Sequence, residues 1–294
     1  MTQDRGRSLR ELIEAGEHSF SFEFFPPKDE AGEQRLWKAI TDLEPYRPTF
    51  VSVTYGAGGA TRDRTVAITE RIARETSLLP VAHLTCVGHT ADEIDSILDD
   101  LEAAGVHHIM ALRGDPADGP RGEWVPTEGG FTHAQELVER AKDRFRVGVA
   151  AFPEKHPASP SLDHDADVLA AKARAGAEFA VTQMFFRVED YVSLVERVRA
   201  RGVDIPVLPG IMPILNLSAI RRQGELIGSE VPPEVVERIQ AHEGDPDAMR
   251  AEGIRIATEM CRGLLAAGAP GLHFFTLNRS KATREIFEGL RITV

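Results

Sequence analysis

Cysteine is scarce in this chain, and the scarcity excludes two kinds of protein. Cys86 and Cys261 are the only cysteines among 294 residues, and they lie far apart. They cannot form a disulfide framework or a closely spaced pair of metal ligands, which is typical of a protein from a reducing compartment. His83 lies near Cys86, but two further ligands are not apparent, so the sequence predicts no metal site.

An excess of basic charge, a secretory leader and a long apolar run are also missing. The 34 lysines and arginines are outnumbered by 46 aspartates and glutamates, which gives a formal charge of -12. Such an acidic chain is a poor partner for nucleic acid or for an anionic membrane surface. The first residues are polar and charged, and the most apolar late stretch, 205–220, contains three prolines. We therefore expect a cytoplasmic protein that binds neither nucleic acid nor membranes.

Strand-like and helix-like patterns alternate along the whole chain. Near its start, Phe20, Phe22 and Phe24 alternate with Ser21 and Glu23, which is the period of a strand with one apolar and one polar face. The predicted strands cover residues 18–24, 49–54, 80–86, 107–112, 146–152, 179–185, 205–210 and 271–277. The predicted helices cover residues 30–44, 61–76, 90–104, 132–144, 162–175, 188–201, 216–228, 245–267 and 279–289, with a further short one at 231–243.

Eight strands, each followed by a helix, predict a (β/α)8 TIM barrel that forms a single domain over residues 1–294. The main alternative is an open doubly wound sheet, which usually carries an early glycine-rich fingerprint. The nearest candidate, Gly56-Ala57-Gly58-Gly59, lacks the GxGxxG spacing, so the barrel is favoured. Thr61 is a plausible N-cap, and Thr90 followed by Glu93 predicts a capping box.

Polar side chains recur where the predicted strands end, which is the end of such a barrel that holds the active site. The set predicts a pocket for a polar ligand, although single members have ordinary alternatives. Glu23 alone could form a salt bridge at the barrel floor, His83 alone could be a core histidine, and Asp115 could cap a turn. Gln183 lies in an apolar strand pattern, and a buried amide there needs hydrogen-bond partners that a ligand could supply.

Eight motifs, in order along the chain, resemble those of methylenetetrahydrofolate reductases. The resemblance extends from residue 19 to about residue 290 and is to the compact bacterial form, which consists of the catalytic barrel only. The motifs are SFEFFPPK (21–28), SVTYGAGG (52–59), AHLTC (82–86), LRGD (112–115), PEKHP (153–157), TQMFF (182–186), PGIMP (209–213) and FTLNR (275–279).

The resemblance implies reduction of 5,10-methylenetetrahydrofolate to 5-methyltetrahydrofolate by NADH or NADPH through bound FAD. Glu23 would be the general acid that protonates the bridging nitrogen of the substrate, with a pKa raised by the barrel interior. Asp115 would lie near the flavin and the pterin, where its charge favours hydride donation. Gln183 would hydrogen-bond the pterin and the nicotinamide in turn, and Arg279 would bind the folate side chain.

The resemblance also implies a cofactor site and a possible homo-oligomer. Positions that hold the flavin or the nicotinamide in the family correspond here to Thr54, Tyr55, His83, Arg113, Gly114, Asp115, Phe152, His156, Asp165 and Lys172.

The chain departs from the family at several of these positions. Phe152 stands where the family usually has tyrosine, Val168 and Ala171 offer no charge to a dinucleotide, and the segment near Ala219 and Gln223 lacks expected ligand contacts. A flavin-free enzyme with direct hydride transfer is therefore an alternative. A pterin- or folate-dependent methyltransferase and a non-catalytic binding protein are the others.

Overall fold

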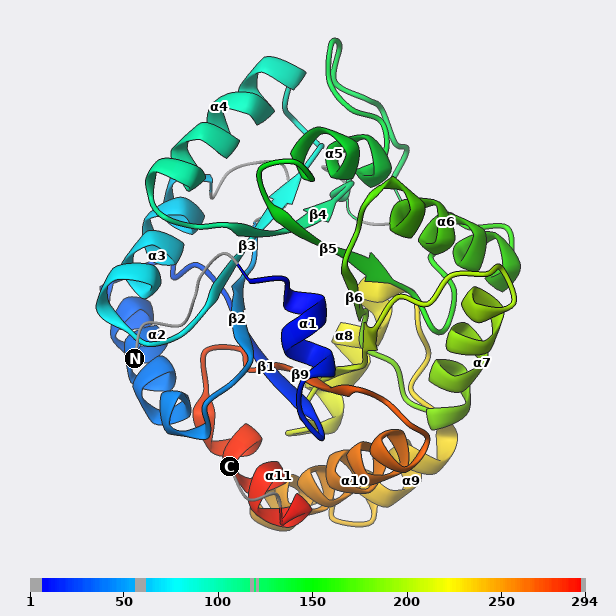
Figure 1. Ribbon diagram of the computed structural model, residues 1–294. Coiled ribbons are helices and arrows are strands. Elements are labelled where there is room, and N and C mark those ends of the chain that lie inside the picture. Colours follow the sequence, from blue (N-terminus) through cyan, green and yellow to red (C-terminus); the bar gives the residue numbers. More distant parts are fainter. Residues whose placement is uncertain (1–6, 56–61, 117–118, 120–121, 292–294) are drawn as a thin grey trace.

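Parallel strands roll into one barrel with helices around it in the computed structural model, which describes residues 7–55, 62–116, 119 and 122–291 (Figure 1). Hydrogen-bonded neighbours follow the order β7-β6-β5-β4-β3-β2-β1-β9-β8. Each paired neighbour is parallel, for example Glu23 of β1 opposite Ser52 of β2 and Phe275 of β9. The fold is therefore the predicted α/β TIM-type barrel.

The elements occupy the predicted regions with small shifts at their ends. The strands are β1 (Ser19–Phe24), β2 (Phe50–Val53), β3 (Pro80–Thr85), β4 (His108–Leu112), β5 (Arg146–Ala151), β6 (Phe179–Thr182), β7 (Val207–Leu208), β8 (Gly210–Ile211) and β9 (Gly271–Phe275). The helices are α1 (Leu9–Glu14), α2 (Glu30–Leu43), η1 (Glu44–Tyr46), α3 (Arg62–Glu75), α4 (Ala91–Ala103), α5 (Ala134–Ala141), α6 (Leu162–Ala175), α7 (Val188–Arg199), α8 (Leu217–Ile227), α9 (Pro233–Gln240), α10 (Pro246–Ala266) and α11 (Ser280–Leu290).

Local signals explain several of these bounds, and one predicted bound is wrong. Thr90 and Glu93 form the predicted capping box at the start of α4, whereas the predicted cap Thr61 lies outside the described residues. β6 ends at Thr182, so Gln183 follows the strand and does not lie within it. Helix α1 and the short helix η1 were not predicted.

The predicted seventh strand is split in two at Pro209. Proline has no N–H to donate to a ladder, and the pairing changes partner there: Leu208 of β7 lies opposite Val181 of β6, whereas Gly210 of β8 lies opposite His273 of β9. The hydroxyl of Thr182 accepts a hydrogen bond from the Gly210 N–H at 2.8 Å. This side-chain bond helps to close the barrel across the break.

The two faces of β1 separate the core from the site. Phe22 and Phe24 are fully buried between the barrel and its helices, where Phe22 lies 5.8 Å from the ring of Phe287 in α11. Burial of each such ring contributes about 2–3 kcal/mol. Ser21 and Glu23 face the barrel interior instead and contact His273 of the neighbouring strand. The alternation predicted from the sequence is confirmed, with its polar face inside the barrel.

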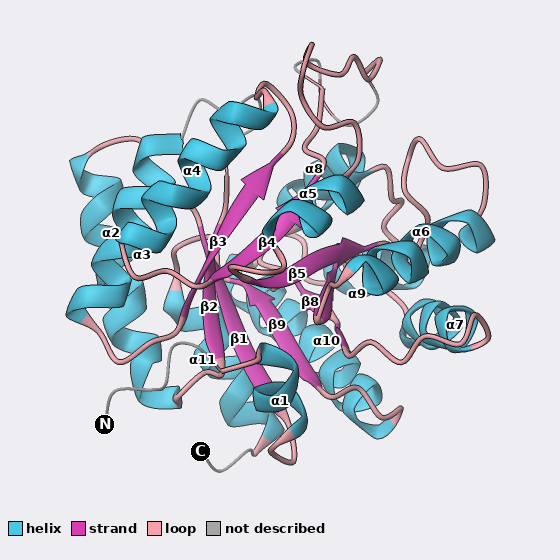
Figure 2. Ribbon diagram, turned by 45° about the horizontal axis from the view of Figure 1, so that its top comes forward, coloured by secondary structure: helices cyan, strands magenta, loops and turns pink. Residues whose placement is uncertain are grey.

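Helix α1 covers the end of the barrel at which the strands begin (Figure 1). Leu9 and Ile13 pack into a buried cluster with Phe50 and Phe179, which belong to β2 and β6. Ser8, the N-cap of α1, donates a hydrogen bond to Glu178 at 2.7 Å. Access to the interior is therefore from the opposite end, where the strands finish. Figure 2 shows the strands enclosed by α2, α3 and α4 on one side and by α6 and α7 on the other.

Within the described ranges, no helix is both long and apolar enough to cross a bilayer.

Candidate functional site

Glu23 lies inside the barrel, next to last in β1, with an exposed fraction of 6%. Three side chains from three other strands converge on its Oε2 atom. His83 Nε2 of β3 lies 3.3 Å from it, His273 Nε2 of β9 lies 3.4 Å from it, and the Ser52 hydroxyl of β2 donates to it at 3.4 Å. The carboxyl therefore lies inside the barrel, near the end at which β1 finishes, and not among the outer helices.

The two oxygens of Glu23 have different surroundings. Oε2 receives all three polar contacts, whereas no side chain in the described part of the chain makes a hydrogen bond with Oε1. A buried carboxylate is stable only when it is hydrogen-bonded or paired. Oε2 meets that need from the protein, which leaves Oε1 available to a ligand.

The expected raised pKa of Glu23 is wrong for this arrangement. Burial raises the pKa, but the hydrogen bond with His273 and the electrostatic attraction of His83 and His273 lower it, as does the Ser52 hydroxyl. The lowering effects prevail, so the pKa of Glu23 lies below its ordinary value. Burial alone would raise the pKa of Glu23, and the contacts of the two histidines with the same oxygen reverse the direction.

His273 was missed by the sequence reasoning. It is almost fully buried, its Nδ1 lies 2.8 Å from the hydroxyl of Ser21, and its ring stacks on Phe50 at 5.7 Å. Contacts on both nitrogens and on the ring face fix its orientation. The available signal was its place in the 271–277 strand pattern, two residues from Phe275, which is opposite Glu23. His83 is where it was expected, and burial lowers its pKa below the ordinary value.

A second cluster lies at the ends of β4 and β5 and on α6. The ammonium of Lys172 donates to the carbonyl oxygen of Ala150 at 3.0 Å, and burial lowers its pKa to about 8 despite the attraction of Asp165. The carboxylate of Asp165 accepts the backbone N–H of His156 at 3.0 Å. The positive charge of Arg113 helps to lower the pKa of both His156 and Lys172. The structure therefore brings four predicted residues together, which are Arg113, His156, Asp165 and Lys172.

Arg113 and Gly114 shape one wall of this second cluster. The guanidinium of Arg113 lies 4.6 Å from the ring centre of Trp124, and burial lowers its pKa. Gly114 has a φ of +83°, and a Cβ atom there would lie 2.4 Å from Cγ1 of Val87. Only glycine fits both the backbone conformation and the space.

Two aromatic pairs complete this side of the mouth. Phe152, at the end of β5, packs edge-on against His156 with 4.7 Å between the ring centres. The hydroxyl of Tyr55 lies 3.0 Å from Nε2 of His89, and both residues are buried. His89 was not predicted, and no motif distinguished it from an ordinary loop residue. Thr54 follows β2, and its backbone N–H donates to the carbonyl oxygen of Phe24.

The remaining predicted residues lie at strand ends with few protein contacts. The side-chain oxygen of Gln183 accepts the N–H of Met184 at 2.9 Å, and no described residue receives a hydrogen bond from its amide nitrogen. Asp115 is exposed beyond β4. Arg279 is exposed at the start of α11, and no ion pair of its guanidinium occurs among the described residues. These groups are free to contact a ligand.

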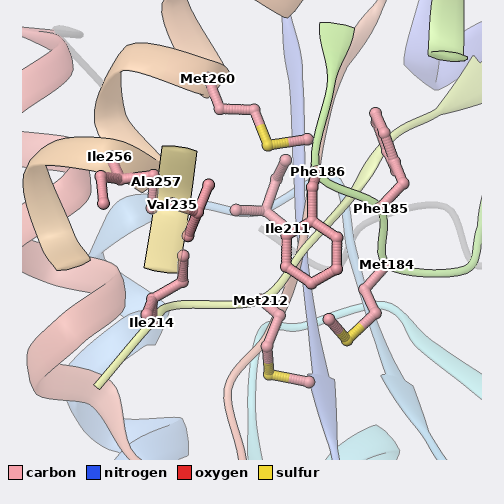
Figure 3. Close-up of a pocket in the computed structure, with 10 residues that line it drawn as sticks. All are labelled: Met184, Phe185, Phe186, Ile211, Met212, Ile214, Val235, Ile256, Ala257 and Met260. Carbon is pink, nitrogen blue, oxygen red and sulfur yellow. The ribbon is translucent and has the colours of Figure 1, made fainter. Parts of the chain in front are cut away.

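A small apolar pocket lies between the residues that follow β6, strand β8 and helix α10 (Figure 3). Phe186 and Met212 line one side of it, and Val235 and Ile256 line the other. All its lining side chains are hydrophobic, so this pocket carries no acid–base chemistry. Elsewhere in the described ranges, no group of three or more histidine, cysteine or acidic side chains is arranged to hold a metal ion.

The fold and the site define a class: a parallel β/α barrel with a buried carboxyl group inside it and basic side chains near the ends of β4 and β5. The family model for methylenetetrahydrofolate reductase matches residues 8–291, and the chain belongs to that family.

Bacterial relatives match over most of their length, whereas longer relatives match in part. The chain is 37% identical to the Escherichia coli 5,10-methylenetetrahydrofolate reductase over 97% of itself and 94% of that protein. It is 36% identical to Arabidopsis thaliana "Methylenetetrahydrofolate reductase (NADH) 1" over 96% of itself. The chain spans half the length of that plant protein.

A solved structure shares the fold. It is described as an uncharacterized protein from Clostridium thermocellum that binds two copies of 5-methyl-5,6,7,8-tetrahydrofolic acid. It matches with a TM-score of 0.68 over 96% of both chains. The identity is 14%, so this likeness concerns the fold alone.

Proposed function

We propose that this protein reduces 5,10-methylenetetrahydrofolate to 5-methyltetrahydrofolate with a nicotinamide dinucleotide, NADH or NADPH, as reductant. The observation that carries the proposal is Glu23, a buried carboxyl with one oxygen held by side chains of three strands and the other without a side-chain hydrogen bond among the described residues. Membership of the reductase family supports it. The Clostridium thermocellum neighbour, whose barrel binds a methylated folate, adds support.

Glu23 acts as the general acid in this proposal. Its proton passes from Oε1 to the bridging nitrogen of the folate, which opens the five-membered ring to an iminium that accepts hydride. The pKa of Glu23 is low in the absence of a ligand. Substrate binding therefore has to raise this pKa before the carboxyl can donate a proton. A pteridine that covers the mouth removes water from it, and this removal is the effect that raises a carboxyl pKa. Glu23 is then protonated in the substrate complex.

Arg113, Lys172 and His156 fit the requirements of an anionic flavin. Lys172 is a largely buried cation whose protein partner is a backbone carbonyl. We propose that these residues, with Asp165, Thr54 and Tyr55, hold FAD. FAD supplies hydride transfer between nicotinamide and folate when it is bound. Asp115 and Gln183 would contact the reacting rings in this proposal, and Arg279 would bind the carboxylates of the folate tail.

The test compares Glu23→Gln with Glu178→Gln, a glutamate on the barrel floor that bonds Ser8 and Arg146. We expect Glu23→Gln to abolish folate reduction while NAD(P)H oxidation with an artificial acceptor continues. Glu178→Gln should retain both activities. Normal folate turnover by Glu23→Gln would overturn the acid assignment.

The visible spectrum of the purified protein decides the flavin part of the proposal. Flavin absorption bands that persist through purification support bound FAD. Their absence, together with folate reduction by NAD(P)H alone, would favour direct hydride transfer. The single-domain boundary, the cytoplasmic location and the homo-oligomer stay predictions from the sequence.

A further inference from the structure

The side chain of Asn278, at the mouth of the barrel, pairs with the backbone of Phe25 just beyond the end of a strand ladder. The ladder between β1 and β9 ends at the pair Glu23 and Phe275. Beyond it, the N–H of Phe25 donates to Oδ1 of Asn278 at 2.9 Å, and Nδ2 of Asn278 donates to the carbonyl oxygen of Phe25 at 2.8 Å. One amide group therefore satisfies both backbone groups of Phe25, as the opposite residue of an antiparallel hydrogen-bonded pair would.

The backbone reaches this position through an unusual turn. Leu277 and Asn278 both have left-handed conformations, with φ of 51° and 55°. Asparagine tolerates this region, but leucine adopts it at a cost, because its Cβ crowds the following carbonyl. Such strain persists only where the surrounding contacts determine the conformation, and it is concentrated at functional sites.

Thr276, which precedes the turn, holds the main chain at Glu23. Its hydroxyl donates to the carbonyl oxygen of Glu23 at 2.7 Å, and its N–H donates to the same oxygen at 3.2 Å. The N–H of Asn278 in turn donates to the Thr276 hydroxyl at 3.2 Å, and the N–H of Arg279 donates to the Thr276 carbonyl at 2.9 Å. The turn thus holds the main chain at Glu23 and at Arg279 together.

We propose that Asn278 is a positioning residue that sets the acid Glu23 relative to His273 and Arg279. The inference rests on the proposed function, because it assigns Asn278 to the proton transfer from Glu23. Phe25 is followed by Pro26 and Pro27, which cannot extend the ladder. Without the Asn278 amide, the segment after Glu23 would be joined to β9 through Thr276 alone. The carboxyl would then sample positions away from the three groups that fix Oε2.

The chain allows a clean substitution experiment. Asparagine occurs only at positions 216 and 278 of the sequence, and Asn216 caps helix α8. Asn278→Ala removes both bonds to Phe25. Asn278→Gly also removes them but takes the left-handed conformation without strain. Asn278→Asp keeps an acceptor for the Phe25 N–H and places a second oxygen against the Phe25 carbonyl.

A matched control lies at the opposite end of the barrel. Glu44 accepts two hydrogen bonds from Ser77, from its N–H at 2.9 Å and from its hydroxyl at 2.7 Å. Glu44→Ala therefore also removes two bonds between a side chain and a neighbouring segment. We expect it to leave folate turnover and its pH profile unchanged.

The measurements are kcat and KM for folate reduction, the pH profile of kcat, NAD(P)H oxidation with an artificial acceptor, and thermal unfolding. Asn278→Ala and Asn278→Gly should lower kcat about 10- to 100-fold and shift the alkaline limb of the profile. NAD(P)H oxidation should be unchanged. Asn278→Asp should also lose folate turnover, because the second bond is replaced by repulsion.

Two results would overturn the inference. One is wild-type kcat and an unmoved pH limb in folded Asn278→Ala and Asn278→Gly. The other is failure of all three Asn278 variants to fold, which would assign the amide to folding and not to positioning. A wild-type protein that does not reduce folate would instead overturn the proposed function, so the two failures are distinguishable.

Discussion

His273 joins Glu23 to Ser21 across two neighbouring strands. Its Nε2 lies 3.4 Å from Oε2 of Glu23, and its Nδ1 lies 2.8 Å from the Ser21 hydroxyl. The imidazole of His273 therefore lowers the pKa of the Glu23 carboxyl. The hydrogen bond with the Ser21 hydroxyl fixes the orientation of the imidazole ring. Three buried polar groups in a row on the inner face of a barrel are costly unless each has a partner, and here each has one.

Substitution of His273 should move the pH dependence of folate reduction. His273→Asn places an amide near the Nδ1 position, which keeps the contact with Ser21 and loses the one with Glu23. Loss of that bond raises the pKa of Glu23, so the acid stays protonated to higher pH and the alkaline limb of kcat moves upward. His273→Gln places its amide near the Nε2 position and should shift the limb less. Equal profiles for the two variants would contradict this role.

Lys172 should make flavin affinity depend on pH. Its pKa of about 8 means that the ammonium loses its charge as the pH rises from 7 to 9. An anionic cofactor should therefore bind less tightly at pH 9, as measured by fluorescence titration with FAD. Lys172→Arg keeps a positive charge over this range and should bind with little pH dependence. The assignment of Lys172 fails if the arginine variant and the wild type show the same slope.

Gly114→Ala should destabilise the fold. The new Cβ would need a φ of +83° and would lie 2.4 Å from Cγ1 of Val87. We expect a loss of about 1–3 kcal/mol in the free energy of unfolding, measured by chemical denaturation. The double variant with Val87→Ala relieves the clash but not the conformation, so it should recover part of the loss. Full recovery would show that the backbone conformation costs nothing.

Thr182→Val should weaken the closure of the barrel. It removes the hydroxyl that accepts the Gly210 N–H, beside the break at Pro209, and leaves that buried donor without a partner. An unsatisfied buried donor costs about 1–3 kcal/mol. Thr182→Ser keeps the hydroxyl and should lose much less. Urea denaturation of the three proteins measures the difference, and equal stability of the valine variant and the wild type would contradict the argument.

The barrel could be predicted because its signals are local. Alternating Phe20, Phe22 and Phe24 identify a strand, and the capping box of Thr90 and Glu93 marks a helix start. Helix α1 was missed because six residues give too short a pattern to distinguish it from a polar N-terminal segment. The break at Pro209 was missed because it depends on a change of strand partner between β6 and β9.

The places of Glu23 and His83 in the strands could be predicted, but the electrostatics around Glu23 could not. Glu23 and His83 were located by the polar face of strands, which the sequence displays directly. The convergence of His83 and His273 on a single oxygen depends on the barrel bringing residues 23 and 273 side by side. Without that contact, burial is the only effect on the pKa of Glu23 that the sequence suggests, and burial alone would raise it. Distant pairs of this kind are what a single sequence does not reveal.

Helix α1 covers the end of the barrel at which the strands begin, so a ligand approaches Glu23 from the end at which they finish. In the proposed function, a folate and a dinucleotide both approach Glu23 from that end, and we expect them to occupy the space above it in turn. One ligand then has to dissociate before the other binds. At high concentration each should therefore compete with the other, and excess folate should slow the oxidation of the reductant.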